Sequence, residues 1–341
     1  LHVRSRRQRQ MCIRDSLMGL RNMLAIAVAG LLTLSGCGAR YEAQDTTADQ
    51  GGESISITDS RGKTVTLDGP AEKVVTLEWS VTEYAVALGV NPVGVADPKG
   101  YAEWDPAVPL QNDPKDVGIR TEPSVDAIAA LEPDLILADV SSIPDKQMAT
   151  IEKIAPVAVF NNATTDGLID LLKENQKKVG TLTGKDAEAK KLAEDYDATI
   201  EECKRKIADA NKEGTPVVYT FPSKTANTID FRMHGPGSGP GIVANDVGLS
   251  NAWSDSGDNN HGISNSDVEG LTSLSEDAHV FYYTAKGGED PIAALNSNGI
   301  WKGLGVVKNN RVHKISESVW PYGGTKSLEQ MAKLYVDTVT R

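Results

Sequence analysis

Aromatic side chains in turn-forming stretches are the residues of this chain best placed to do chemistry. Aromatic residues make up only 5% of the sequence, yet several fall in or near polar stretches rich in turn-forming residues: Tyr101, Trp104, Trp253, Trp320 and Tyr322. Trp79 follows the end of a predicted strand. Such side chains present a rigid apolar face with a polar tip, and open α/β sheets bind ligands in the loops that follow their strands. The clustering predicts a ligand-binding surface, with separate packing roles as the alternative.

The residues that a catalytic or metal site needs are sparse. The sequence contains no G-x-S-x-G, H-E-x-x-H or P-loop motif. The histidines His234, His261, His279 and His313 all fall in the second half, whereas a metal pocket between two halves takes ligands from both. Residues 235–241 are glycine-rich and offer N–H groups to an anion, but their prolines and lack of lysine favour a plain loop. We therefore expect no catalytic centre, no directly bound metal and no cofactor.

A short apolar run followed by a cysteine predicts a lipid anchor. Arg21 precedes the apolar residues 24–32, and Leu34-Ser35-Gly36-Cys37 follows them, which is the order of a bacterial lipoprotein signal. The alternative is a membrane span with a chance cysteine, but a span needs about 20 apolar residues. We predict that Cys37 carries the lipid and tethers the protein at the outer face of the cytoplasmic membrane, in the periplasm or at the cell surface.

Composition narrows the partners. The 341 residues include 35 Lys+Arg and 47 Asp+Glu; without residues 1–36, 29 basic and 46 acidic residues remain, a formal charge of −17. This charge argues against nucleic acid and an anionic membrane surface as partners. Lipidation of Cys37 leaves only Cys203 for the body of the protein, so no internal disulfide or iron–sulfur cluster is expected. Residues before Met18 look like an adaptor artefact, and we exclude them from the fold.

Alternating strand and helix patterns predict an α/β fold with a parallel sheet. Residues 54–67 alternate around Arg61-Gly62 and predict a β-hairpin. Residues 74–77 and 93–95 predict buried strands, with a helix over 81–88 between them.

A helix–strand unit occurs twice in the sequence. Residues 124–131 and 133–138 predict a short helix and a buried strand, and residues 267–274 and 278–283 repeat that order about 140 residues later. The repetition suggests two lobes built alike, although such units are common enough in α/β proteins for chance to be the alternative.

One long amphipathic helix is expected between the two lobes. Within residues 186–212, the side chains Leu192, Tyr196, Ile200, Cys203 and Ile207 form one apolar stripe, and the helix would be about 40 Å long. Cys203 on this stripe is expected to be a buried apolar residue. A strand over 216–220 and a helix over 327–339 follow. The predicted division is a leader and signal peptide over 1–36, a tether over 37–53, lobes over 54–185 and 213–341, and the helix over 186–212.

Several stretches resemble ferric siderophore-binding proteins, the capture subunits of ABC importers, and the ferric hydroxamate-binding proteins in particular. They are Val117-Gly118-Ile119-Arg120-Thr121-Glu122-Pro123-Ser124, Tyr101 with Trp104, Leu131-Glu132-Pro133-Asp134, His234-Gly235-Pro236-Gly237 and Trp320-Pro321-Tyr322-Gly323-Gly324. The resemblance covers nearly all of residues 54–341. It implies two Rossmann-like α/β lobes joined by a single long α-helix, as in periplasmic binding proteins of the helical-backbone type, with a ligand between the lobes and no enzymatic activity.

The resemblance also implies which residues bind the ligand. The ligand arginine falls on Arg120, whose guanidinium donates to the oxygens that hold the iron; a surface ion pair with Glu122 is the alternative. Trp104 matches an aromatic residue of the first-lobe wall, and Trp320 and Tyr322 match aromatic residues of the second-lobe wall. The aromatic pattern described above adds Trp79 and Tyr101 to the expected ligand residues, and Arg232 and Lys99 are expected as basic helpers.

Two positions depart from the family pattern and bear on the ligand. Ser141 lies in the stretch where a tyrosine is expected, and His261 replaces an expected tryptophan. A single strong donor favours a hydroxamate or mixed-carboxylate complex over a highly anionic one. A heme or corrinoid ligand is the alternative on the same scaffold, with Tyr101, His234 or His261 as axial ligand.

Two acidic residues match the positions with which this family docks on its permease. They are Asp126 and Glu269, one from each copy of the repeated unit, and the alternative role of both is to stabilise a helix N-terminus. The expected partners are therefore a ferric siderophore and an ABC permease with its ATPase, and the protein is expected to be a monomer. An enzyme on a related two-lobed fold would need cluster-binding cysteines, and a purely structural envelope lipoprotein would not need Arg120 among aromatic residues.

Overall fold

The computed structural model describes residues 54–226 and 228–341, all of which belong to one compact unit. The predicted leader, signal peptide, tether and lipidated Cys37 lie outside the described residues. Within the described residues, no helix has both the length and the apolar character needed to cross a membrane.

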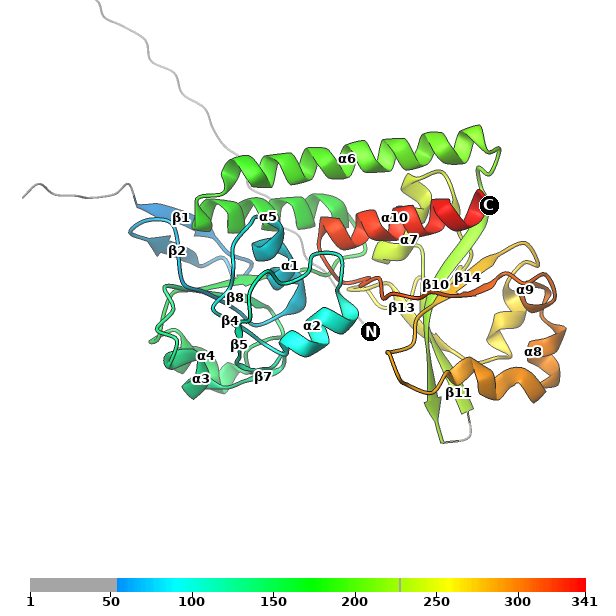
Figure 1. Ribbon diagram of the computed structural model, residues 1–341, viewed down its shortest axis with the longest axis horizontal. Helices are drawn as coiled ribbons and strands as arrows, with labels where there is room; N and C mark the ends of the chain where they lie inside the picture. The colour runs from blue at the N-terminus through cyan, green and yellow to red at the C-terminus, as the bar shows by residue number, and fades with distance from the viewer. Residues whose placement is uncertain (1–53, 227) are drawn as a thin grey trace, which may run out of the picture. The chain divides into compact units, whose positions relative to one another are not determined.

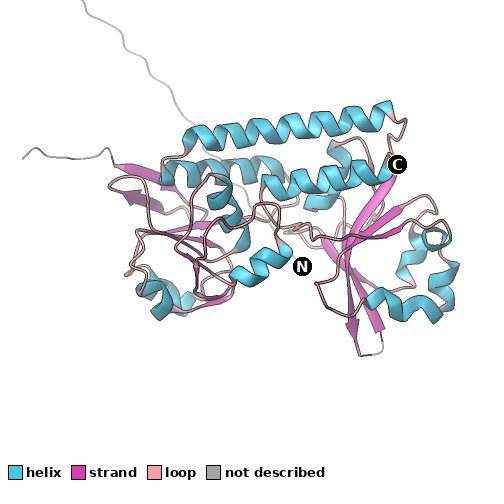
Figure 2. Ribbon diagram, in the orientation of Figure 1, coloured by secondary structure: helices cyan, strands magenta, loops and turns pink. Residues whose placement is uncertain are grey.

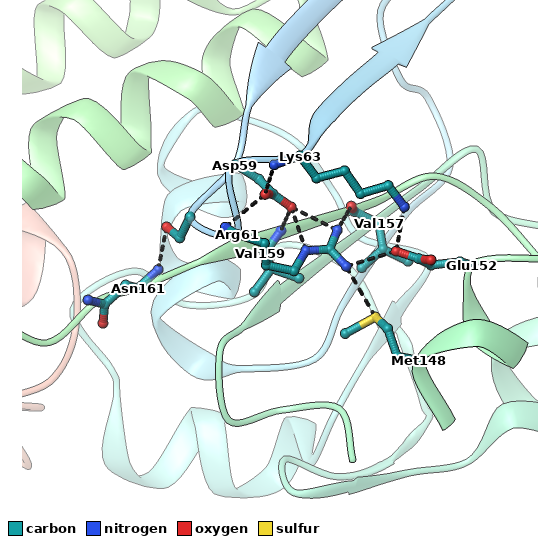
Figure 3. Close-up of polar contacts among 9 residues, drawn as sticks. Asp59, Arg61, Lys63, Met148, Glu152, Val157, Val159 and Asn161 are labelled. Atoms are coloured by element: carbon teal, nitrogen blue, oxygen red, sulfur yellow. Dashed lines mark hydrogen bonds and ion pairs between the residues drawn. The ribbon is translucent and has the colours of Figure 1, made fainter. Parts of the chain in front are cut away.

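The predicted hairpin is confirmed and is tied to the first sheet by a polar network. Strands β1 (Ile55–Thr58) and β2 (Thr64–Leu67) pair antiparallel. Figure 3 shows Asp59 accepting from the side chain of Arg61 and from Val159 N, while Arg61 also donates to Glu152 and to the carbonyl oxygen of Val157. Burial raises the pKa of Asp59, but these donors outweigh burial and hold it below its usual value.

A five-stranded parallel sheet forms the core of the N-terminal half, as predicted. Its order is β5-β4-β3-β8-β9, and the strands are β3 (Val74–Thr76), β4 (Gly94–Val95), β5 (Lys115–Asp116), β8 (Leu135–Asp139) and β9 (Val157–Phe160). The central strands are buried along nearly their whole length, which explains their continuous apolar sequences. The helices of this half are α1 (Trp79–Ala87), α2 (Pro98–Trp104), α3 (Val125–Ala129), α4 (Asp145–Ile151) and α5 (Leu168–Thr183).

The expectation of a loop around Tyr101 and Trp104 is wrong, because these residues lie on helix α2. Asp97 begins the helix by accepting a hydrogen bond from Gly100 N at 3.0 Å. Pro98 occupies the first helical position, where its missing N–H costs nothing. The cap and the proline together outweigh the turn-forming composition of the stretch.

The sheet of the C-terminal half is mixed and not parallel throughout. Its order is β13-β11-β10-β14-β15, with β12 also pairing with β10, and the strands are β10 (Pro216–Thr225), β11 (Thr228–His234), β12 (Ser250–Asn251), β13 (Ile263–Ser266), β14 (His279–Tyr282) and β15 (Val312–Lys314). Strands β10 and β11 are close neighbours in the chain and pair directly, so they are necessarily antiparallel. Figure 2 shows the strands of the two sheets as separate groups.

The repeated helix–strand unit is less regular in its second copy. Helix α3 and strand β8 form the first copy, whereas the second consists of the single 3₁₀ turn η1 (Gly270–Ser273) before β14. Gly270 lies at the start of the turn, and glycine disfavours a regular helix. The remaining helical segments of this half are α7 (Gly239–Asp246), η2 (Pro291–Ser297), α8 (Gly299–Gly303) and α9 (Gly305–Lys308).

The long helix α6 (Asp186–Asp209) confirms the predicted element and ends three residues earlier than expected. Its predicted apolar stripe is buried, Cys203 included. Helices α5 and α10 (Thr325–Val339) pack against it, as Figure 1 also shows. The predicted fold class, an α/β fold with a long helix as in periplasmic binding proteins, is therefore confirmed.

We retain the boundaries 54–185, 186–212 and 213–341 as our proposal for the two lobes and the helix that joins them.

Candidate functional site

Two adjoining pockets form the candidate site, and both are lined by residues from the two halves of the chain. Their volumes are about 480 and 550 Å³, and Arg120, Arg232 and Trp320 line both. The first pocket is mainly aromatic and is called here the aromatic pocket; its other ring residues are Trp79, Trp104, Phe221 and Tyr283. The second is called the polar pocket and includes Glu78, Ser80, Asp139, Ser141, Asn161, Asn162, His261 and Tyr322.

Arg120 lies where the two pockets meet. It occupies the turn between the short strands β6 (Gly118–Ile119) and β7 (Glu122–Pro123). Its guanidinium carbon is 3.9 Å from the ring centre of Trp79 and 5.4 Å from that of Trp320, distances at which a cation is attracted to the ring faces. The rings hold the guanidinium at the site, with its N–H groups able to meet an oxygen ligand.

The ion-pair partner of Arg120 is Glu78 and not Glu122, which corrects the alternative considered from the sequence. Arg120 Nη1 lies 2.5 Å from Glu78 Oε1, and the side chain of Glu78 is only 13% exposed. Burial raises the pKa of Glu78, and the charge of Arg120 opposes that shift. Arg120 therefore faces the cavity with much of its charge already compensated.

The aromatic wall combines residues from distant parts of the chain. Trp104 packs edge-on against Tyr283, with ring centres 5.3 Å apart, and against Phe221 at 5.9 Å. Trp320 lies 4.9 Å from Trp79 and 5.0 Å from Tyr322. Phe221 and Tyr283 were missed by sequence reasoning. Phe221 directly follows the strand predicted over 216–220, and Tyr283 ends the strand predicted over 278–283. Their signal was therefore a place at predicted strand ends, where α/β sheets bind ligands.

Tyr101 and Trp253 do not line either pocket. Tyr101 is fully buried, and its hydroxyl donates to the carbonyl oxygen of Val108 at 2.6 Å. It packs beneath Trp79 and Trp320, so it supports the wall from behind and does not present a surface to a ligand. Trp253 is buried in the separate core of the C-terminal sheet and donates to Ser264 Oγ.

The two departures from the family pattern lie on the polar pocket. Ser141 donates to Asp139 Oδ1 at 2.8 Å, and His261 packs edge-on against Tyr322 with ring centres 5.3 Å apart. Asn162 extends this polar lining by donating to Asp139 Oδ2 and to Ser80 Oγ. The pocket therefore offers hydroxyl, amide and carboxylate groups to a ligand where the family pattern has aromatic rings.

The hairpin network described above also shapes the polar pocket. Ser60, in the hairpin turn, accepts a hydrogen bond from Asn161 N at 2.8 Å, and both residues line the pocket. The Asp59–Arg61 pair adjoins Ser60 and ties the hairpin to β9 (Figure 3). The network thus fixes one rim of the polar pocket.

His234 positions Tyr322 and is not available as a ligand. Its Nδ1 lies 3.0 Å from the carbonyl oxygen of Tyr219 and its Nε2 lies 3.0 Å from the Tyr322 hydroxyl. Burial lowers the pKa of His234 to about 4 and raises that of Tyr322 to about 12. The neutral ring therefore donates through Nδ1 and accepts from Tyr322. Of the three candidate axial ligands for heme, only His261 faces a pocket.

Charge in the two pockets is weighted towards carboxylates. Arg120 and Arg232 are the basic lining residues, whereas Lys99 lines neither pocket, contrary to expectation. Four carboxylates line the same surfaces: Glu78, Asp139, Asp230 and Glu289. No group of three or more histidine, cysteine or acidic residues able to hold a metal ion occurs among the described residues.

The two predicted docking acids are exposed. Asp126 lies in the first turn of α3, where Ser124 Oγ accepts from Ala127 N, and Glu269 directly precedes η1.

The glycine-rich stretch 235–241 is only partly the expected loop, because α7 begins within it at Gly239. Ser238 caps that helix by accepting from Gly241 N.

Comparisons with known proteins agree with this architecture. The model of the periplasmic binding protein family matches residues 74–319, and the chain belongs to that family. It is 28% identical to the Fe(3+)-citrate-binding protein of Bacillus subtilis (strain 168), over 91% of this chain and 94% of the relative. It is 25% identical to the iron(3+)-hydroxamate-binding protein of Escherichia coli (strain K12), over 75% of this chain and 82% of the relative.

Solved structures of siderophore-binding proteins also superpose on this chain. A siderophore-binding protein of Vibrio cholerae with bound Fe3+-Desferal superposes with a TM-score of 0.68 at 27% identity, covering 79% of this chain and 98% of that one. A Staphylococcus aureus protein in complex with staphyloferrin B superposes with a TM-score of 0.61 at 26% identity, covering 82% and 97%. The resemblance to siderophore-binding proteins of ABC transporters is thus confirmed, and the chain is a binding protein and not an enzyme.

Proposed function

We propose that this protein captures a ferric siderophore in the two adjoining pockets and delivers it to an ABC importer. The observation that carries the proposal is the position of Arg120, held against Trp79 and Trp320 where the pockets meet. A guanidinium there donates to the oxygens around a chelated iron, while the aromatic wall packs on the organic part of the complex. The iron arrives already chelated, so the protein supplies no ligand to the metal.

The charge of the lining favours a neutral or cationic complex. Two arginines face four carboxylates across the pockets, and Glu78 already pairs with Arg120. A ferric trihydroxamate is neutral at its iron centre and needs few donors. A ferric tricatecholate carries three negative charges and would be repelled by the carboxylates that Arg120 does not pair with, Asp139, Asp230 and Glu289. We therefore favour a hydroxamate siderophore, with a mixed-carboxylate complex as the next choice.

Delivery requires attachment and docking. We propose that Cys37 anchors the protein by its lipid to the outer face of the membrane. Asp126 and Glu269 would pair with basic residues of the permease, because both side chains are exposed at the start of a helical turn. Surface charges of this kind act mainly on association rate and register.

A fluorescence titration tests the proposed ligand. The soluble form that begins after Cys37 is titrated with ferrioxamine B, ferrichrome, ferric citrate, a ferric tricatecholate, hemin and cobalamin, each beside its metal-free form where one exists. We expect saturable quenching by a ferric trihydroxamate that the iron-free chelator does not reproduce. A response to hemin or cobalamin alone would instead support a heme or corrinoid ligand, for which His261 is the axial candidate that faces a pocket.

A further inference from the structure

Two buried carboxylates lie behind the aromatic wall and line neither pocket. Glu83 is on α1, one turn after Trp79, and Asp105 directly follows Trp104 at the end of α2. The two residues are only 1% and 0% exposed. Burial of an ionised carboxylate is costly unless hydrogen bonds compensate it, so the surroundings of both groups must explain their presence.

Glu83 is compensated by the N-terminus of helix α10, from the far end of the chain. Its Oε2 accepts from Gly324 N and from Ser327 Oγ, both at 2.7 Å. Its Oε1 accepts from Lys326 N at 3.0 Å and from Ser327 N at 3.1 Å. The first N–H groups of a helix lack internal partners and carry partial positive charge, and α10 has no capping side chain of its own. Glu83 is therefore the cap of α10.

The backbone at this point leaves no room for side chains. A Cβ added at Gly323 would collide with Glu83 Oε2. A Cβ at Gly324 would lie 2.9 Å from Glu83 Oε1 and 2.7 Å from the ring of Tyr84. These two glycines directly follow Trp320-Pro321-Tyr322, so the close approach of Glu83 determines the path of the segment that carries two residues of the pocket lining.

The hydrogen bonds of Ser327 locate a proton on Asp105. The Ser327 hydroxyl has a single hydrogen, yet Oγ lies 2.7 Å from Glu83 Oε2 and 2.9 Å from Asp105 Oδ1. Glu83 already accepts three backbone N–H groups, an arrangement that suits its ionised form. Ser327 therefore donates to Glu83, and Asp105 must carry a proton to donate to Ser327. Burial and the neighbouring charge of Glu83 both raise the pKa of Asp105 well above its usual value.

We propose that Glu83, Asp105 and Ser327 form a positioning cluster for the ligand-binding wall, with Glu83 ionised and Asp105 protonated. The cluster joins α1, which carries Trp79, to α2, which carries Trp104, and to the segment with Trp320 and Tyr322. Its members touch no ligand. They act by holding Trp320 against Trp79, at 4.9 Å between ring centres. The inference rests on the proposed function only in taking this wall as the ligand surface.

Two conservative substitutions with opposite expected results test the proposal. Glu83→Gln replaces one carboxylate oxygen by an NH2 group, so either Gly324 N or both Lys326 N and Ser327 N lose their acceptor and the cap is disrupted. Asp105→Asn keeps a neutral group of the same shape that still donates to Ser327, and so preserves the cluster. We expect E83Q to weaken ferrioxamine B binding by about 10-fold or more, because it loses a buried charge-assisted hydrogen bond. We expect D105N to change the affinity by less than about 3-fold, because it retains the hydrogen bond to Ser327.

A spectroscopic measurement on the ligand-free protein separates this inference from the proposed function. The near-ultraviolet circular dichroism of the Trp79–Trp320 pair, identified by its loss in Trp320→Phe, should vanish in E83Q and persist in D105N, even if no siderophore binds. A native signal in E83Q, or equal loss in D105N, would overturn the proposal. If E83Q does not fold, Ser327→Ala takes its place, because it removes a donor to Glu83 and the partner of Asp105. Retention of the native signal and affinity in S327A would equally overturn the positioning role.

Discussion

Replacing Glu78 by glutamine tests whether the pairing of Arg120 sets the charge selectivity of the site. Glutamine keeps an oxygen that accepts from Arg120 but removes the negative charge of Glu78. The Glu78 side chain is 13% exposed, and its Oε1 lies 2.5 Å from Arg120 Nη1. The variant should leave a neutral ferric trihydroxamate bound within about 3-fold of the parent affinity, since the hydrogen bond to Arg120 survives and the ligand carries little charge. A highly anionic complex should bind more tightly.

The size of that gain follows from Coulomb's law. One unit charge about 10 Å from a triply charged ferric catecholate, at an effective dielectric constant of about 40 to 80, contributes about 1.2 to 2.5 kcal/mol, or about 8- to 70-fold in affinity. The gain should shrink as salt is raised, because the screening length is about 8 Å at physiological ionic strength.

The assay is a pair of fluorescence titrations, with ferrioxamine B and with a ferric tricatecholate, at low and at physiological salt. Glu122→Gln is the matched control, because Glu122 is exposed, lies two residues after Arg120 in sequence and lines neither pocket. An anionic ligand that binds E78Q no more tightly than it binds E122Q would refute the reasoning. So would a salt-independent gain, since it would point to a change in shape and not in charge.

Four further predictions concern binding, docking, attachment and stability. Arg120→Ala should weaken ferric siderophore binding by about 1–3 kcal/mol through loss of a charge-assisted hydrogen bond, and unchanged affinity in the same titration would remove Arg120 from the site. Asp126→Ala with Glu269→Ala should lower the rate of uptake into cells or vesicles that carry the permease while leaving the affinity for free ligand unchanged, because both acids are exposed and line neither pocket; normal transport would count against docking. Cys37→Ala should release the protein from membranes with ligand binding intact, as fractionation would show, and persistent attachment would contradict the anchor. Asp59→Asn should lower the free energy of unfolding at neutral pH by about 1–3 kcal/mol. Because the folded-state pKa of Asp59 lies below its usual value, its stabilisation is present above that usual value and disappears as pH falls through the folded pKa, so chemical denaturation should show the variant converging on the parent in acid; a constant deficit would argue against an ionised Asp59.

Local patterns in the sequence were enough to predict most elements and the class of the protein. The apolar stripe from Leu192 to Ile207 predicted helix α6, and the alternation around Arg61-Gly62 predicted the hairpin. Such patterns are readable because burying one face of a helix or strand spaces its apolar residues at the period of that element. Arg120 was named from a motif whose residues are contiguous. The prediction of a loop at Tyr101 and Trp104 was wrong. Asp97 caps a helix there, and this specific hydrogen bond outweighs the turn-forming composition of the stretch.

The relationships between distant residues were decided only by the tertiary structure. The sequence suggested Glu122 as the partner of Arg120, whereas folding brings Glu78 to it from 42 positions away. Phe221 and Tyr283 joined the wall because Trp104 packs against them from the other half of the chain. Glu83 capped a helix that begins more than 240 residues later. A side chain's charge, burial and partners depend on which surfaces meet, and that information is carried by the packing of whole elements and by no local pattern.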